Sequence, residues 1–326
     1  MAQPGLPMTL HRQAQAVLDL LNAAPTPLKN LPPTEARAAY DRFIVPRNFD
    51  PAPVGKVEDR MVPGGNGEQR ARIYWPDYRP DGDQTSLPVF LFIHGGGFVI
   101  GSIESRDPQC RLICRDANCI VVSLDYRLAP EHPFPAAPED CWSGLQWLAQ
   151  NAAGLGGDPA RIAVGGESAG GNLAAGLALR AREAGAPGLC AQILVYPVTD
   201  MLFEQDLPSY DLLDEDYFLT REQMEWYYDC YAPGVSQTDD MLLSPCKADD
   251  LSDLPPTQIV TAEFDPLRDD GKHYGERLAA AGVPVEYACM PGMIHGYWHY
   301  GKLIDAASEA LSLNIDALKR AFAQQD

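Results

Sequence analysis

The sequence predicts an α/β protein with a mostly parallel central sheet and helices on both of its faces. Apolar runs of strand length alternate with longer segments whose apolar residues recur at helical spacing, which is typical of strand–helix–strand units. Glycine-rich motifs follow two of these runs directly, at residues 94–97 and 166–170. The length of 326 residues suits one large domain of this class with an added cap.

Residues 1–45 are predicted to form a separate N-terminal helical segment. Residues 14–21 carry apolar side chains at helical spacing, and a proline-rich break follows at residues 25–33. A second short helix is expected at residues 34–40, where a proline marks its start. This segment is interpreted as a helical cap, and packing on the surface without that role is the alternative.

Strand patterns begin at residue 55. Residues 57–62 and 70–75 flank a glycine-rich turn and predict a hairpin. Residues 87–93 and 119–124 are nearly continuous apolar runs, as expected for strands that are buried on both faces. Further strands are predicted at residues 161–164, 192–196, 258–263 and 285–289, and helices at residues 106–116, 138–151, 171–180, 271–281 and 306–322.

Residues 201–233 interrupt this alternation with many aromatic and acidic side chains. We interpret them as a cap insertion over the edge where the strands end, because α/β proteins bind ligands there. Such an insertion would close a small pocket with an apolar lining. A pair of ordinary surface helices with core aromatics is the alternative. The catalytic domain would then comprise residues 46–326.

The pentapeptide Gly166-Glu167-Ser168-Ala169-Gly170 lies between an apolar run and a predicted helix. The pattern G-x-S-x-G in this context describes a nucleophile elbow, a sharp turn that lifts the serine hydroxyl clear of the sheet. The positive end of the following helix would stabilise an anion beside that hydroxyl. Ser168 is therefore the candidate nucleophile, and a glycine-rich turn without chemistry is the alternative.

The motif His94-Gly95-Gly96-Gly97 follows the predicted strand at residues 87–93. Consecutive glycines let the backbone run close to a substrate and direct its N–H groups inward, as an oxyanion hole requires. A flexible loop is the alternative. His94 itself is expected to brace the loop by a hydrogen bond.

Asp265 and His295 follow two later strands and come after Ser168 in the order Ser, Asp, His. A serine hydroxyl is a poor nucleophile until a neutral imidazole takes its proton, and a carboxylate fixes the tautomer of that imidazole. His295 is the candidate base and Asp265 its partner.

Three other residues compete for these roles. His299 lies four residues after His295 and competes for the role of base. Asp269 and Asp270 compete for the role of acid, but they lie further from the strand and are expected to begin the next helix.

Together these motifs resemble those of the hormone-sensitive-lipase family of esterases, which has the α/β-hydrolase fold. The likeness runs from about residue 55 to the C-terminus, and the N-terminal part matches the helical cap of that family only loosely. The resemblance implies Ser168 as nucleophile, with the N–H groups of Gly96, Gly97 and Ala169 as the oxyanion hole. Glu167 stands where many relatives carry Asp, and no functional change is inferred from it. The matching stretches are residues 94–97, 125–131, 166–172, 265–269 and 295–296.

Residues 125–131 belong to the resemblance but suggest no catalytic role. They are expected to act as a structural brace, with Arg127 paired to a carboxylate.

The implied function is that of a serine carboxylesterase, which hydrolyses short- to medium-chain esters through an acyl-enzyme without a metal or organic cofactor. The same triad could serve a deacetylase, a lactonase or an amidase. A non-catalytic ligand receptor of the same fold is disfavoured, because such receptors lose the triad histidine and His295 is present.

Composition argues against two classes of partner, and the implied partner is a small-molecule ester. The 25 Lys and Arg against 45 Asp and Glu give a net charge of −20, which argues against nucleic acid and anionic membranes.

Residues 1–10 lack the features of a secretory signal, and the apolar runs are too short to span a bilayer. The eight cysteines form no C-x-x-C pair, which argues against a zinc site. Because no export signal is recognised, free thiols in a cytoplasmic protein are expected. A homodimer, the stereochemistry and the physiological ester are left open.

Overall fold

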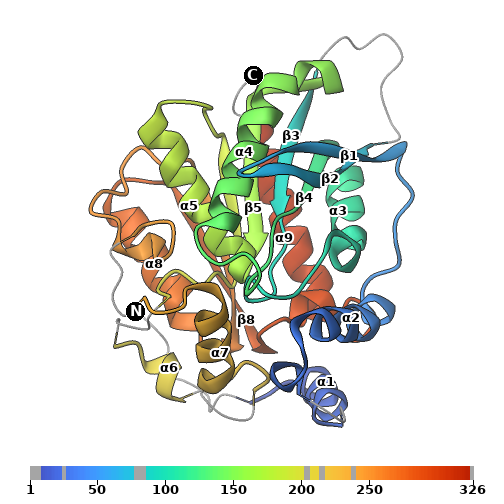
Figure 1. The fold of residues 1–326 in the computed structure, drawn as a ribbon, viewed down its shortest axis with the longest axis vertical. Helices are drawn as coiled ribbons and strands as arrows, with labels where there is room; N and C mark the ends of the chain where they lie inside the picture. Colours follow the sequence, from blue (N-terminus) through green and yellow to red (C-terminus); the bar gives the residue numbers. More distant parts are fainter. Residues whose placement is uncertain are drawn as a thin grey trace.

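The computed structural model describes residues 9–23, 27–76, 86–201, 206–212, 217–235 and 240–323. Their centre is an eight-stranded sheet in the order β1-β2-β4-β3-β5-β6-β7-β8, shown in Figure 1. Strand β2 is antiparallel to both of its neighbours, and all other pairs are parallel. The predicted α/β fold is therefore confirmed. The strands are β1 (Lys56–Gly64), β2 (Gly67–Trp75), β3 (Leu87–Ile93), β4 (Ile120–Asp125), β5 (Gly157–Glu167), β6 (Ala191–Val195), β7 (Thr257–Phe264) and β8 (Val285–Ile294).

The apolar runs of the sequence form the middle of this sheet. Every residue of β3 and of β6 is buried, as expected for parallel strands covered on both faces. The first two strands form the predicted hairpin, in which Gly64 pairs with Gly67 across the turn. Strands β5 and β8 are longer than predicted. Their ends include prolines and glycines, which are uncommon in strands, so the sequence pattern did not reveal these residues as part of a strand.

Helices cover both faces of the sheet (Figure 1). Helices α3 (Ile103–Asp116) and α9 (Asp305–Ala323) pack on one face, and α4 (Ala136–Asn151), α5 (Ala169–Ala184) and α8 (Arg268–Ala280) on the other. The predicted start of α3 at residue 106 was wrong by three residues. Ser102 and Ser105 form a capping box that begins the helix earlier, and Pro108 obscured this in the sequence.

In the described part of the chain, four further helices lie at the end of the sheet where the parallel strands terminate (Figure 1). They are α1 (Arg12–Asn22), α2 (Pro33–Ile44), α6 (Pro208–Leu212) and α7 (Arg221–Tyr231). Helices α1 and α2 come from the predicted N-terminal segment, and α6 and α7 from the predicted insertion. Residues 1–8, 24–26, 202–205 and 213–216 of these two segments lie outside the described residues. Short 3₁₀ helices occur at Leu28–Asn30, Val45–Arg47, Ala153–Leu155, Pro245–Lys247 and Tyr297–His299.

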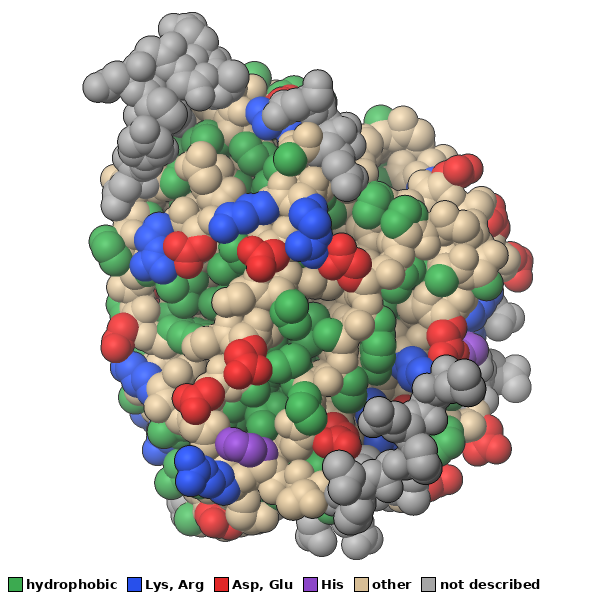
Figure 2. All heavy atoms as spheres, turned by 180° about the vertical axis from the view of Figure 1, so that it is seen from behind, with side chains coloured by type: hydrophobic (Ala, Val, Ile, Leu, Met, Phe, Trp, Pro, Cys, Tyr) green, Lys and Arg blue, Asp and Glu red, His purple; other side chains and the backbone are tan. Residues whose placement is uncertain are grey.

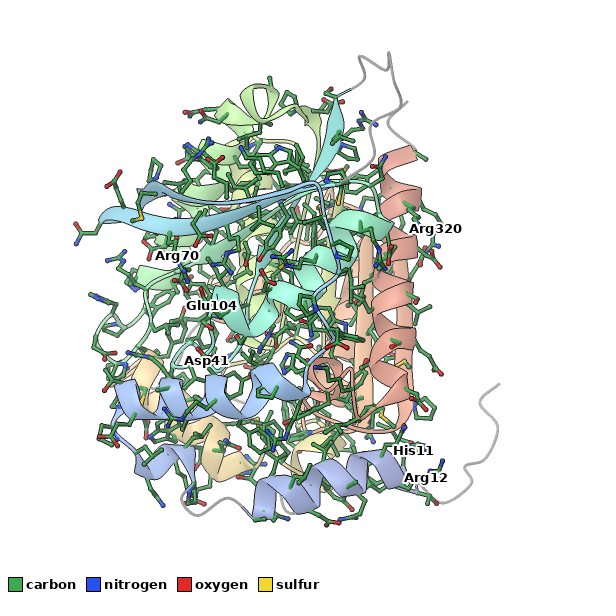
Figure 3. All side chains as sticks on the ribbon, turned by 90° about the vertical axis from the view of Figure 1, so that its right-hand side faces the viewer. His11, Arg12, Asp41, Arg70, Glu104 and Arg320 are labelled. Atoms are coloured by element: carbon green, nitrogen blue, oxygen red, sulfur yellow. The ribbon has the colours of Figure 1, made fainter. Side chains whose placement is uncertain are left out.

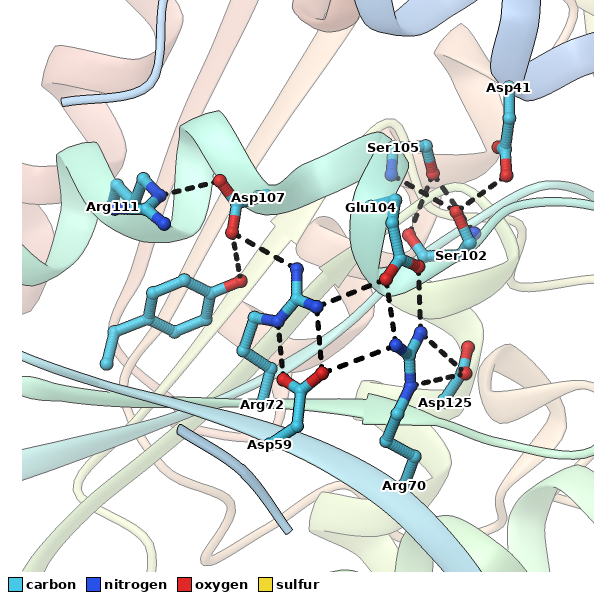
Figure 4. Close-up of polar contacts among 11 residues, drawn as sticks. Asp41, Asp59, Arg70, Arg72, Ser102, Glu104, Ser105, Asp107, Arg111 and Asp125 are labelled. Carbon is cyan, nitrogen blue, oxygen red and sulfur yellow. Dashed lines mark hydrogen bonds and ion pairs between the residues drawn. The ribbon is translucent and has the colours of Figure 1, made fainter. Parts of the chain in front are cut away.

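A network of charged side chains fastens the β1–β2 hairpin to α3 (Figure 4). Arg70 makes paired hydrogen bonds to Glu104 at 2.8 and 2.7 Å. Arg72 reaches Asp59 on the neighbouring strand at 2.6 Å. Several of these groups are half-exposed, so each pair contributes little stability by itself and the network acts through its number of contacts.

The face behind the view of Figure 1 shows acidic and basic side chains mixed with apolar ones (Figure 2). Among the residues that the structure describes, no helix combines the length and the apolar character needed to cross a bilayer.

Candidate active site

Ser168 occupies a sharp turn between β5 and α5. Its φ of 55° lies in the left-handed region, which a residue with a side chain rarely adopts. A Cβ atom at Gly166 would overlap the carbonyl oxygen of Gly170, and one at Gly170 would overlap that of Ile93. Glycine is therefore required on both sides of Ser168 for this turn to close.

The structure brings Ser168, His295 and Asp265 together from three strand ends. The Nε2 atom of His295 lies 3.0 Å from Ser168 Oγ, and its Nδ1 atom lies 2.7 Å from Asp265 Oδ2. Asp265 is fully buried, and its Oδ1 accepts a hydrogen bond from the backbone N–H of Leu267 at 2.8 Å. This arrangement allows the imidazole to take a proton from the serine hydroxyl while the carboxylate holds its other nitrogen.

Gly96 and Gly97 lie beside Ser168 and line the same cavity, together with Ala169. The two glycines have φ values of 120° and 58°. A Cβ atom at Gly96 would overlap the carbonyl group of Ile100, and one at Gly97 the ring of Tyr227. Ala169 is the first residue of α5, so its N–H has no partner within the helix. These three backbone N–H groups are thus candidates to receive a negatively charged oxygen.

The cavity above Ser168 has a volume of about 80 Å³ and a largely apolar lining. Leu28 lines it from the segment between α1 and α2, and Leu219, Met224 and Tyr227 line it from in and beside α7. Residues from both of these segments therefore line a cavity over the strand ends. Its other apolar lining residues are Phe98, Ile100, Val198, Met201, Phe218 and Leu267.

A buried ion pair lies directly beneath the site. Glu167 and Arg106 are both at most 1% exposed, and Glu167 Oε1 accepts hydrogen bonds from Arg106 Nε at 2.7 Å and Gly95 N at 2.5 Å. Burial opposes ionisation of Glu167, but the positive charge of Arg106 holds the pKa of the carboxyl well below its usual range. Arg106 in turn donates to the hydroxyl of Tyr40 on α2 at 2.8 Å. Glu167, which precedes Ser168, is thereby connected to the glycine loop directly and to the N-terminal segment through Arg106.

The competing residues have other partners, although His299 lines the same cavity and its Nε2 lies 3.3 Å from Glu167 Oε2. His299 Nε2 contacts Tyr196 Oη at 3.2 Å, and burial together with Arg106 lowers the pKa of its imidazole to about 4. Asp269 and Asp270 both lie in the first turn of α8, as expected. The carboxylate of Asp269 pairs with Arg268, and that of Asp270 accepts the backbone N–H of Thr199 at 2.8 Å.

His94 and Arg127 have the bracing contacts that the sequence suggested. The His94 ring stacks on Tyr126 with 4.4 Å between the ring centroids, and its Nδ1 contacts Gly95 O at 2.9 Å. Arg127 makes two hydrogen bonds of 2.8 Å to the carboxylate of Asp140.

Sequence reasoning missed Arg106 and Tyr227. Arg106 was placed in a helix, but nothing in the local pattern marks its side chain as buried against a residue 61 positions away. Tyr227 belongs to the aromatic residues of the predicted insertion, and its place against Gly97 depends on how α7 packs. Both contacts are long-range, so only a signal from the tertiary structure could have found them.

Comparison with known proteins agrees with the fold. A family model described as the alpha/beta hydrolase fold matches residues 90–299. The carboxylesterase NlhH of Mycobacterium tuberculosis is 45% identical over 292 residues, which cover 88% of this chain and 89% of the relative. The ethyl acetate hydrolase of Pseudomonas putida is 38% identical over 248 residues, or 74% of this chain and 77% of the relative. The crystal structure of LAE6, an alpha/beta hydrolase enzyme from the metagenome of Lake Arreo, has a TM-score of 0.90 and 37% identity and covers 97% of this chain and 99% of its own.

Proposed function

The chain belongs to the α/β-hydrolase family, in its hormone-sensitive-lipase-like branch, and we propose that it is a serine carboxylesterase for short- to medium-chain esters. The observation that carries this proposal is the continuous Ser168–His295–Asp265 arrangement, in which Ser168 and His295 line an apolar cavity. The names of the relatives, carboxylesterase and ethyl acetate hydrolase, support the same reaction.

In the first half of the proposed reaction, Ser168 attacks the carbonyl carbon of the ester while His295 takes the hydroxyl proton on Nε2. The backbone N–H groups of Gly96, Gly97 and Ala169 stabilise the oxyanion of the tetrahedral intermediate. Asp265 holds Nδ1–H and stabilises the imidazolium that forms. The intermediate collapses when His295 gives its proton to the leaving alcohol, and an acyl-enzyme remains.

In the second half, a water molecule takes the place of the alcohol. His295 removes a proton from this water as it attacks the acyl carbonyl, and the same N–H groups hold the second oxyanion. Collapse of this intermediate returns the proton to Ser168 Oγ and releases the carboxylic acid.

We propose that the cavity sets the range of acyl chains. Apolar walls stabilise each added methylene by about 0.8 kcal/mol until the space is full. Because the cavity lining is largely apolar, we expect kcat/KM to peak at acyl chains of about two to eight carbons and to fall for longer chains.

We also propose that residues 1–45 and the insertion at residues 201–233 together form the cap, because both contribute walls to the cavity. A reducing compartment such as the cytoplasm is proposed on different grounds, namely that all eight cysteines are free thiols.

The test is a series of p-nitrophenyl esters from acetate to palmitate, measured beside emulsified triolein. We expect a preference for the shorter esters, and labelling by a fluorophosphonate probe that Ser168→Ala abolishes. A preference for triolein with a jump in rate once droplets form would contradict the proposed substrate class. Absence of both turnover and labelling would overturn the proposed function itself.

A further inference from the structure

The loop that carries Gly96 and Gly97 continues through a residue in an unfavourable conformation. Phe98 has a φ of 63°, which a residue with an aromatic side chain rarely adopts. The loop folds back on itself, since Gly96 O accepts hydrogen bonds from Val99 N at 3.1 Å and Ile100 N at 2.9 Å. Such a conformation persists only where the surrounding structure holds it, so the contacts of residues 98 and 99 determine where the glycine N–H groups lie.

Two neighbouring segments hold Phe98 itself. Its ring stacks on Tyr231 of α7 with 3.8 Å between centroids and 2° between planes. Its carbonyl oxygen accepts the N–H of Ala129 at 2.9 Å. Residues 125–131, to which the sequence assigned no catalytic role, therefore brace the glycine loop directly.

Arg37 of α2 connects the Gly96–Gly97 loop to residues 125–131. Its Nε donates to Val99 O at 2.8 Å, and one of its terminal nitrogens donates to Ala129 O at 2.8 Å. The same guanidinium makes paired hydrogen bonds to the carboxylate of Glu131, at 3.0 and 2.5 Å. A planar guanidinium can satisfy acceptors on two backbone segments at once, which a lysine cannot do in this fixed geometry.

A second contact holds α2 in register with the same loop. Asp41, one helical turn after Arg37, accepts a hydrogen bond from Ser102 Oγ at 3.0 Å, as Figure 4 shows. In Figure 3, Asp41 lies on the side of α2 that faces the sheet, in the direction of Glu104 at the start of α3. Helix α2 thus contacts residues 99–102 from one face, and Arg37 is the part of that face that reaches the strained turn.

From this geometry we infer that Arg37 is a positioning residue for ester hydrolysis. Its guanidinium fixes the Gly96–Gly97 N–H groups relative to Ser168 by holding Val99 and Ala129 together. This inference rests on the proposed function. The N-terminal segment then acts in the reaction as well as lining the pocket, because the position of the oxyanion hole depends on a side chain from α2.

The experiment compares Arg37→Gln with two matched variants in the full-length protein. Arg42→Gln removes the same charge from an exposed position on the same helix. Glu131→Gln weakens the ion pair and leaves both carbonyl contacts of Arg37 in place. Because an oxyanion hole acts in the transition state, we expect Arg37→Gln to lower kcat by about 10- to 100-fold with little change in KM. Arg42→Gln should stay within about twofold of the wild type, and Glu131→Gln should lose less than Arg37→Gln.

Chemical rescue separates positioning from folding. In Arg37→Ala, added N-ethylguanidine can occupy the vacated space and restore both carbonyl contacts, so kcat should rise with its concentration, whereas Arg42→Ala should not respond. Urea unfolding of each variant shows whether the native state is retained. A folded Arg37→Gln with the kcat of the wild type would overturn the inference, as would equal losses in Arg37→Gln and Glu131→Gln. A wild-type protein without esterase activity would instead refute the proposed function.

Discussion

Replacing Asp265 by asparagine tests the candidate triad most sharply, because the structure dictates which way the new amide must face. Asp265 Oδ1 accepts the N–H of Leu267 at 2.8 Å, and Oδ2 faces His295 Nδ1 at 2.7 Å. The amide oxygen of an asparagine must remain on the Leu267 side to accept that N–H. Its NH₂ group is then directed at Nδ1, which can only accept, so the imidazole proton moves to Nε2.

This tautomer cannot take the proton of Ser168, because the nitrogen that faces Oγ at 3.0 Å would already carry a hydrogen. In the serine protease that serves as the reference for this chemistry, the same exchange lowers kcat by about 10⁴-fold. We expect a loss of that order here, equivalent to about 5.4 kcal/mol of transition-state stabilisation. The fold should survive, since asparagine occupies nearly the same space.

The assay is kcat for p-nitrophenyl butyrate, with Asp269→Asn as the matched control. The carboxylate of Asp269 pairs with Arg268 and does not contact His295 in the structure, so this variant should keep most of its turnover. Combining Asp265→Asn with His295→Ala should cost little more than the larger single loss, because members of such a unit act together. Near wild-type turnover in a folded Asp265→Asn, with a large loss in Asp269→Asn, would refute the assignment.

Three further predictions concern the loop, the buried charges and the pH dependence of stability. Gly97→Ala should lower kcat by at least about tenfold in the same ester assay. The left-handed backbone costs a residue with a Cβ about 1–2 kcal/mol, and the new methyl would overlap Tyr227. Adding Tyr227→Leu should recover part of this loss. Arg106→Met should reduce the free energy of unfolding in urea by about 3–5 kcal/mol because it leaves Glu167 buried without a counter-charge, and a loss below about 1 kcal/mol would contradict this account. Burial raises the pKa of Asp270 to about 7, so its contribution to stability is present at low pH and is lost as pH rises from about 4 to about 7, by at most about 1.4 kcal/mol per pH unit. Urea unfolding at several pH values should show this slope in the wild type but not in Asp270→Asn.

The parts of the molecule that follow from local patterns could be predicted from the sequence. The strand at residues 87–93 is apolar throughout because it is buried on both faces. A continuous apolar run of this length is typical of such strands. The turn around Ser168 requires glycine at two fixed positions, so it leaves a short and specific motif. Asp265 and His295 could be proposed because each follows a strand, and parallel strands end at the same edge of the sheet.

The parts that depend on distant pairs could not be predicted. Arg37 lies 62 residues before Val99 and 94 before Glu131, and nothing in α2 distinguishes it from a solvated arginine such as Arg42. The sequence indicates no functional difference between Glu167 and the aspartate of many relatives. In the structure, the Glu167 carboxylate accepts hydrogen bonds from both Gly95 and Arg106. Long-range hydrogen bonds of this kind leave no periodicity in the sequence, because their two partners have different neighbours along the chain.

The cavity walls and the reacting groups come from different structural elements. Ser168, Asp265 and His295 are anchored by the sheet, whereas Leu28, Leu219 and Met224 belong to segments at its edge. We therefore expect that these wall residues can be exchanged without disturbing the hydrogen bonds that connect the candidate triad. For laboratory evolution, mutagenesis of these three positions is a compact library that we expect to change substrate acceptance while leaving Ser168, Asp265 and His295 in place.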